Sequence, residues 1–101
     1  MKNNISDTSP FISIVCPCYN EEDVIEHFLK SMTKILEQSQ KTYEIIFIDD
    51  GSKDATLNVL LESKKNYENI RVLKLSRNFG KEVALTAGLD ASIGETVVPI
   101  D

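Results

Sequence analysis

Apolar residues follow two alternating patterns along the chain, and each pattern predicts one type of secondary structure. Short apolar runs rich in β-branched residues predict strands, and apolar residues at helical spacing between them predict helices. The resulting β-α-β-α-β-α-β order indicates a mainly parallel sheet with right-handed crossovers and helices on both faces. We therefore predict a three-layer α/β unit with the strand order 3-2-1-4. The predicted strands are 12–16, 43–49, 70–75 and 96–101, and the predicted helices are about 20–36, 54–66 and 81–92.

Residues typical of turns and caps mark the predicted boundaries of the first two strands. Pro17 is expected to stop the first strand because proline cannot donate to a ladder, and Asn20 is the predicted N-cap of the first helix. After the second strand, Gly51 allows a sharp turn, and Ser52 or Asp54 is expected to cap the next helix.

The third helix and the fourth strand carry their own signals. A stripe of small residues predicts close contact between this helix and the sheet, and Gly94 is the predicted helix stop. Pro99 requires a sheet edge, a bulge or the end of its strand, and the sequence does not choose among these. The stripe consists of Ala84, Ala87, Gly88 and Ala91.

The second strand organises the rest of the chain. Its run 45–48 is apolar throughout, as expected for a strand that is buried on both faces, and Asp49 and Asp50 follow directly. Both acids are therefore expected at the carboxyl end of a central strand, where open α/β sheets bind ligands. Taken alone, they could equally be turn and cap residues.

Polar and aromatic side chains also follow the other predicted strands, so they are expected to converge on one edge of the sheet. An aromatic ring can stack on a base, a carboxylate can accept from a base N–H, and basic side chains can bind phosphate. A terminal carboxylate can hold a hard divalent cation. The set predicts a nucleotide site. Its members are Pro17, Tyr19, Asn20, Glu21, Asp49, Asp50, Gly51, Ser52, Ser76, Arg77, Asn78, Gly80, Lys81 and Asp101.

Composition removes several other classes of protein. The 101 residues make one domain or less, and the net charge of −5 without a basic run disfavours nucleic-acid binding. Cys16 and Cys18 would point to the same side of a strand, with too few further ligands for a metal site, so two free thiols are expected. Neither a G-x-G-x-x-G turn nor a P-loop follows the first strand, which argues against a dinucleotide dehydrogenase and a P-loop NTPase.

Two motifs resemble the start of family-2 glycosyltransferases, which have the GT-A fold and use nucleotide-diphosphate sugars. They are residues 14–21, IVCPCYNE, and 48–54, IDDGSKD. Residues 76–82, SRNFGKE, with 87–91 and 94–95, resemble the branch that acts on polyprenyl phosphate, such as dolichol-phosphate mannosyltransferases and bactoprenol glucosyltransferases. Residues 1–10 are interpreted as a polar lead-in from their composition, and over 11–101 the resemblance implies the Rossmann-like nucleotide-binding half of a GT-A fold.

The same resemblance implies a role for each site residue. Pro17, Tyr19 and Glu21 would line the base pocket, and Asp50 would bind the edge of the base with Asp49 behind it. Arg77 and Lys81 would lie near the ribose or diphosphate. Asp101 would be the catalytic first acid of a D-x-D motif that binds Mg²⁺ or Mn²⁺.

The implied reaction is metal-assisted, inverting transfer of a sugar from a UDP- or GDP-linked donor to a polyprenyl phosphate or glycan. The chain stops before the second acid of the D-x-D motif, so we expect the front part of a longer enzyme, inactive by itself, cytoplasmic, with its parent at the cytoplasmic membrane face. Self-association through an unpaired sheet edge is a further expectation. Two alternatives are a non-catalytic nucleotide-binding module and a receiver-type signalling domain, although the latter wants an acidic pair after the first strand.

Overall fold

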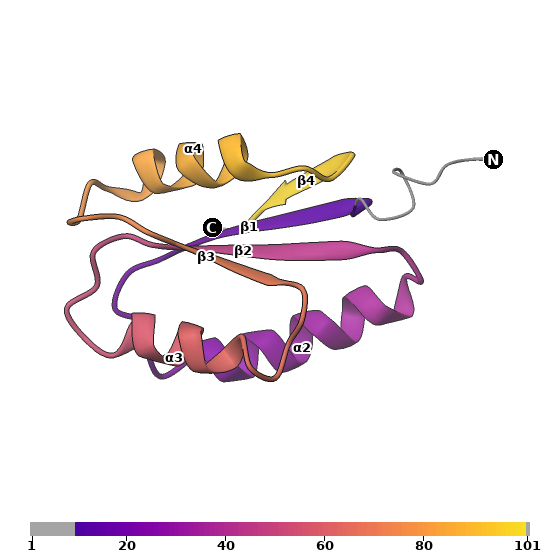
Figure 1. The fold of residues 1–101 in the computed structure, drawn as a ribbon, viewed down its shortest axis with the longest axis horizontal. Helices are drawn as coiled ribbons and strands as arrows, with labels where there is room; N and C mark the ends of the chain where they lie inside the picture. The colour runs from indigo at the N-terminus through magenta and orange to yellow at the C-terminus, as the bar shows by residue number, and fades with distance from the viewer. Residues whose placement is uncertain (1–9, 101) are drawn as a thin grey trace.

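The computed structural model describes residues 10–100 and confirms the predicted three-layer arrangement. Four parallel strands form one sheet in the order β3-β2-β1-β4. Helices α2 and α3 cover one face, and α4 covers the other (Figure 1). The elements are β1 Ile12–Cys18, α2 Ile25–Gln38, β2 Tyr43–Asp49, α3 Thr56–Ser63, β3 Ile70–Lys74, α4 Lys81–Ala91 and β4 Thr96–Pro99.

Strand β2 supplies the apolar core on both sides of the sheet, as its sequence predicts. Ile45 and Phe47 belong to the cluster beneath α2 and α3, whereas Ile46 and Ile48 belong to the cluster beneath α4. The four side chains are almost completely buried. On the α2 side, the ring of Phe28 meets Phe47 edge to face, with centroids 5.9 Å apart. Side chains that alternate along one central strand therefore hold all three layers together.

Helix α4 lies close to the sheet because part of its inner face has almost no side chains. Ala84 and Gly88 are buried, as the stripe predicts. A Cβ at Gly88 would lie 2.4 Å from Val15 Cγ1 and 2.5 Å from Ile48 Cδ1. These distances leave no room for a larger residue, so the glycine sets the spacing between helix and sheet.

Two boundary predictions about the first half of the chain need correction. Strand β1 does not stop at Pro17 but runs on to Cys18. The N–H that Pro17 lacks would face β4. Because β4 already ends at Pro99, which pairs with Val15, the proline costs the sheet no hydrogen bond at this position. Helix α2 begins at Ile25 and not near Asn20. These segments are ordered by contacts with other loops, which local signals do not encode.

The second half differs in smaller ways. Helix α3 begins at Thr56, whose N–H donates to Asp54 Oδ1 at 2.8 Å, so Asp54 serves the helix start although Ala55 occupies the N-cap. The same helix ends at Ser63, earlier than predicted. Helix α4 ends at Ala91, before Gly94. Gly94 instead allows close approach to β1, because a Cβ there would lie 2.7 Å from the Ser13 nitrogen. Pro99 is the last residue of an edge strand.

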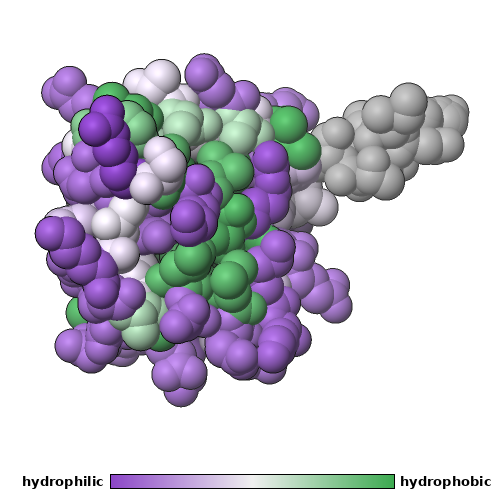
Figure 2. All heavy atoms as spheres, turned by 60° about the vertical axis from the view of Figure 1, so that its left-hand side comes forward, coloured by the Kyte–Doolittle hydropathy of each residue, from purple (hydrophilic) through white to green (hydrophobic). Residues whose placement is uncertain are grey.

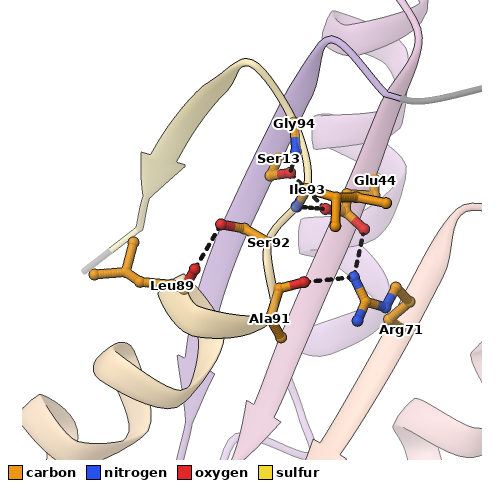
Figure 3. A network of polar contacts seen from close by, with 8 residues as sticks. All are labelled: Ser13, Glu44, Arg71, Leu89, Ala91, Ser92, Ile93 and Gly94. Atoms are coloured by element: carbon orange, nitrogen blue, oxygen red, sulfur yellow. Dashed lines mark hydrogen bonds and ion pairs between the residues drawn. The ribbon is translucent and has the colours of Figure 1, made fainter. Parts of the chain in front are cut away.

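A polar network closes the amino end of the sheet, and Figure 3 shows its members around Glu44. The Arg71 guanidinium donates to Glu44 Oε1 and to the carbonyl of Ala91, at 2.8 and 2.9 Å. The Ser13 hydroxyl and the Ile93 N–H donate to Glu44 Oε2. Burial raises the pKa of Glu44, but these donors and the charge of Arg71 outweigh it and hold the pKa below its ordinary value. The carboxylate therefore ties β1, β2 and β3 to the segment after α4.

Candidate functional site

The loops after β1 and β2 are joined at the carboxyl edge of the sheet. The Asn20 N–H donates to Ser52 Oγ at 2.9 Å, and its Oδ1 accepts from the Lys53 N–H at 2.8 Å. The Glu21 N–H donates to Thr56 Oγ1 at 2.7 Å. Asn20 has a φ of 54°, in the left-handed region that asparagine tolerates better than most residues. Asn20 thus fastens two loops together and does not cap a helix.

Asp50 joins the loop after β2 to the loop after β3. Its Oδ1 accepts from the Phe79 N–H at 2.8 Å, and its Oδ2 accepts from the Gly80 N–H at 3.1 Å. The Asn78 amide donates to Oδ2 at 3.3 Å and to the Asp50 carbonyl at 3.2 Å. The Asp50 N–H donates to the Cys18 carbonyl at 2.8 Å. Three consecutive strand ends therefore meet at one aspartate that is 3% exposed.

Arg77 lies on the loop that Asp50 holds. A Cβ at Gly51 would lie 2.3 Å from the Arg77 carbonyl carbon, so the two loop backbones are in direct contact. Gly51 has a φ of 69°, which also favours glycine. The Arg77 guanidinium carbon lies 4.7 Å from the centroid of the Phe79 ring, a cation–π contact. Sequence reasoning gave no role to Phe79, although it lies inside the motif that carries Arg77.

The predicted site residues fall into two hollows on the same side of the sheet. Pro17 and Glu21 line a pocket of about 140 Å³ between β1 and α2. Asp49 and Arg77 line another of about 280 Å³ beside α3. Asp49 is 2% exposed and accepts the Ser52 N–H at 3.2 Å. One hollow lies beside β1 and the other beside the loops after β2 and β3.

The remaining predicted residues lie at the surface of the same edge. Tyr19 is 40% exposed just beyond β1, and Lys81 is the exposed first residue of α4. Apolar side chains come to the surface on this side of the molecule among hydrophilic ones (Figure 2). An exposed aromatic ring with basic side chains nearby can stack on a base and bind an anion. The roles predicted for these residues and for Asp50 stay predictions.

Among residues 10–100, no group of three or more histidine, cysteine, aspartate or glutamate side chains is placed to hold a metal ion. The predicted ligand Asp101 lies outside the described residues. Cys16 and Cys18 are free, as expected, and the structure shows that both are buried. The side-chain hydrogen bond with Cys16 and burial raise the pKa of Cys18 far above its ordinary value, so this thiol stays protonated. The residues described here do not by themselves fit a metal site.

Known proteins of similar sequence are glycosyltransferases. Residues 13–101 match the family described as glycosyl transferase family 2. The chain is 49% identical over 90 residues to the uncharacterized glycosyltransferase sll0501 of Synechocystis, covering 89% of this chain and 28% of that protein. It is 44% identical over 90 residues to the bactoprenol glucosyl transferase of Shigella phage SfX, covering 89% of this chain and 30% of that protein. The chain thus spans under a third of the length of these relatives.

Solved structures agree with the fold. TarS of S. aureus, solved with UDP-GlcNAc, aligns with a TM-score of 0.75 at 30% identity, covering 89% of this chain and 26% of that one. A mannosyltransferase of Pyrobaculum calidifontis, solved with GDP-Man and Mn²⁺, aligns with a TM-score of 0.76 over 88% of this chain and 26% of that one. Its identity of 23% supports the fold alone.

No helix among residues 10–100 has both the length and the apolar character needed to cross a membrane. The strand order predicted from the alternating pattern and the GT-A fold implied by the resemblance are both confirmed, and the family match argues against a receiver domain. Because the match covers residues 13–101, the chain belongs to glycosyl transferase family 2.

Proposed function

We propose that this chain is the donor-binding part of a glycosyltransferase that moves a sugar from a nucleotide-diphosphate sugar to a polyprenyl phosphate. The observation that carries the proposal is the joining of three loops at the carboxyl edge of a parallel sheet, in a member of this family. The 44% identity to bactoprenol glucosyl transferases supports the lipid-phosphate acceptor.

The donor base is proposed to lie beside β1. Pro17 and Glu21 already line a pocket there, and Tyr19 offers an exposed ring at the same strand end. The ring can stack on a base, and the Glu21 carboxylate can accept from an N–H of its edge. The N–H groups of a uracil or a guanine base can satisfy this chemistry, and we propose UDP or GDP as the nucleotide.

The diphosphate is proposed to lie toward the loop after β3. Arg77 presents a planar guanidinium that can donate two parallel hydrogen bonds to phosphate oxygens, and Lys81 adds a second positive charge at the start of α4. Mg²⁺ or Mn²⁺ at Asp101 stays part of the proposal, and such an ion would neutralise charge on the leaving diphosphate.

The test uses the full-length protein with UDP-glucose, UDP-GlcNAc or GDP-mannose as donor and undecaprenyl phosphate as acceptor. We expect one donor to give a lipid-linked sugar, detected by mass spectrometry of the extracted lipid. Asp101→Asn is expected to remove most of this product, whereas Asp90→Asn, an exposed acid on α4, serves as the control with unchanged turnover.

Each failure has a distinct meaning. Nucleotide binding without transfer to any acceptor would favour the non-catalytic module. Absence of both binding and transfer with all three donors would overturn the proposed function. Full metal-independent transfer by Asp101→Asn would refute the role of that residue alone.

A further inference from the structure

Cys16 and Cys18 are two thiols at the end of β1 to which the proposed function gives no role. They lie two positions apart on one strand, so both side chains point to the face that α2 covers. Their exposed fractions are 9% and 3%, and the Cys18 thiol donates to the Cys16 carbonyl at 3.6 Å. A side-chain hydrogen bond between the two thiols lowers the pKa of Cys16 and raises the pKa of Cys18. The two sulfur atoms are therefore close neighbours.

The spacing of the two residues is compatible with a disulfide. A parallel strand rises about 3.3 Å per residue, so Cα atoms two positions apart are separated by about 6.6 Å. Disulfides join residues whose Cα atoms lie roughly 4.4–6.8 Å apart, so a bridge here would be at the long end of the range. A small contraction of the strand would bring the pair to the ordinary distance.

The end of β1 can contract because it is held mainly from one side. Among residues 10–100, β1 pairs with β4 only as far as Val15. Pro17, which lies between the two cysteines, has no N–H to donate to a neighbouring strand. On the other side, the Asp50 N–H donates to the Cys18 carbonyl at 2.8 Å. Contraction would displace this carbonyl and the adjacent Tyr19, whose ring is proposed to stack on the donor base.

A small oxidant has access to the two thiols. Both line the pocket of about 140 Å³ between β1 and α2, together with Pro17 and Glu21. A water molecule takes up about 30 Å³ of liquid volume, so the pocket has room for a molecule as small as hydrogen peroxide. The donor base is proposed to lie at the same place. A bound nucleotide would therefore shield the thiols from the oxidant.

We propose that Cys16 and Cys18 form a peroxide-sensitive pair, whose oxidation to a disulfide reversibly weakens donor binding. The inference rests on the proposed function and adds a means of regulation to the same site.

The oxidation takes place in two steps. The Cys16 sulfur attacks one oxygen of hydrogen peroxide and breaks the O–O bond, which gives a sulfenic acid and a hydroxide that becomes water with the Cys16 proton. The Cys18 sulfur then attacks the sulfenic sulfur, so the S–S bond forms and the hydroxyl group leaves with the Cys18 proton as a second water. Two thiols thus lose two electrons and two protons, and one peroxide is reduced to two waters.

The experiment treats the full-length protein with hydrogen peroxide, with and without bound UDP or GDP. Mass spectrometry measures the loss of two hydrogen atoms from the peptide that contains both cysteines. Calorimetry measures UDP and GDP affinity before oxidation, after it, and after reduction with dithiothreitol. Cys16→Ser and Cys18→Ser are the matched variants, because each keeps one thiol at the end of β1 but cannot form the bridge.

We expect peroxide to join the two cysteines and to weaken binding of the preferred nucleotide roughly tenfold, which corresponds to the loss of one or two hydrogen bonds. Dithiothreitol should restore the affinity, and bound nucleotide should slow the oxidation. In each serine variant, the affinity after peroxide treatment should stay within about twofold of the value for the same variant before treatment.

Other outcomes would overturn the inference. One is a peptide that gains oxygen on a cysteine without forming the bridge, and another is a bridge that leaves nucleotide affinity unchanged. Serine variants as sensitive to peroxide as the unchanged protein would place the effect at other residues. If the reduced protein binds neither nucleotide, the proposed function fails and the regulation fails with it, whereas normal binding that peroxide does not alter removes the inference alone.

Discussion

Two acidic side chains are buried at opposite ends of the central strand, and their surroundings differ. Glu44, near the start of β2, faces the Arg71 guanidinium at 2.8 Å, so its charge is neutralised inside the fold. Asp50, just after β2, accepts only from neutral N–H groups of the next loop. The basic side chains nearest in sequence to those donors, Arg77 and Lys81, are exposed at the surface.

The difference separates stability from binding. A buried carboxylate that already has its counter-charge offers nothing to a ligand, and its removal is expected to cost only folding free energy. At the carboxyl edge Asp49 and Asp50 are buried whereas Arg77 and Lys81 are exposed, so two positive charges face the solvent where an anion could bind. Substitutions at the amino end of the sheet are therefore expected to change the free energy of unfolding. Substitutions at the carboxyl end are expected to change nucleotide affinity.

Arg71→Met removes the ion pair at the amino end of the sheet and should cause the largest loss of stability among these substitutions. It keeps much of the apolar stem but leaves Glu44 buried without its cation, which should lower the free energy of unfolding by about 2–4 kcal/mol. Urea unfolding at pH 7 measures it, with the exposed Lys30→Met as control. A loss equal to that of the control would show that the network does not stabilise the fold.

Gly51→Ala should reduce both folding stability and nucleotide affinity, so it tests whether the two depend on the same loop contact. The left-handed backbone alone costs an L-residue roughly 1–2 kcal/mol, and the new Cβ would meet the Arg77 backbone. We expect a stability loss of about 2 kcal/mol together with weaker UDP or GDP binding. Unchanged nucleotide affinity in a destabilised variant would separate the loop contact from the site.

The pH dependence of stability tests whether the ionised carboxylate of Glu44 stabilises the fold. Its pKa is lowered in the folded state, so the ionised carboxylate stabilises the fold above its ordinary value of 4.5. That contribution is lost as the pH falls through the lowered folded pKa. The stability advantage of the unchanged protein over Glu44→Gln should be full at pH 7 and shrink below about pH 4.5, as urea titrations at several pH values would show. A constant advantage down to pH 3 would contradict the linkage.

Arg77→Ala should have the smallest effect on stability and a clear effect on binding. The side chain is exposed, so the free energy of unfolding should change by less than about 0.5 kcal/mol. Nucleotide affinity should nevertheless fall about tenfold or more, because a charge-assisted contact to phosphate is lost. Calorimetry and thermal unfolding of the same sample measure both. If the variant binds UDP and GDP as tightly as the unchanged protein does, Arg77 does not contact the nucleotide.

The sequence predicts the fold well because its signals are local. Alternation of apolar runs with helical periods indicates the strand order, and the unbroken run 45–48 indicates the central strand. Asn20 could not be interpreted in this way, because its side chain accepts from an N–H that lies 33 positions away. Glu44 was missed as well, although a charged residue in a strand covered on both faces is itself a signal of a buried partner.

Helix α4 gives these two regions a mechanical connection. Asp50 accepts the N–H of its N-cap residue Gly80, while Arg71 donates to the carbonyl of its last residue, Ala91. The 11-residue helix spans about 16 Å. Gly88, three residues before the end of the helix, lies directly against Val15 and Ile48 and sets the distance between helix and sheet there. A substitution that loosens the contacts at one end of α4 should therefore alter the angle of the helix, and with it the position of the loop at the other end.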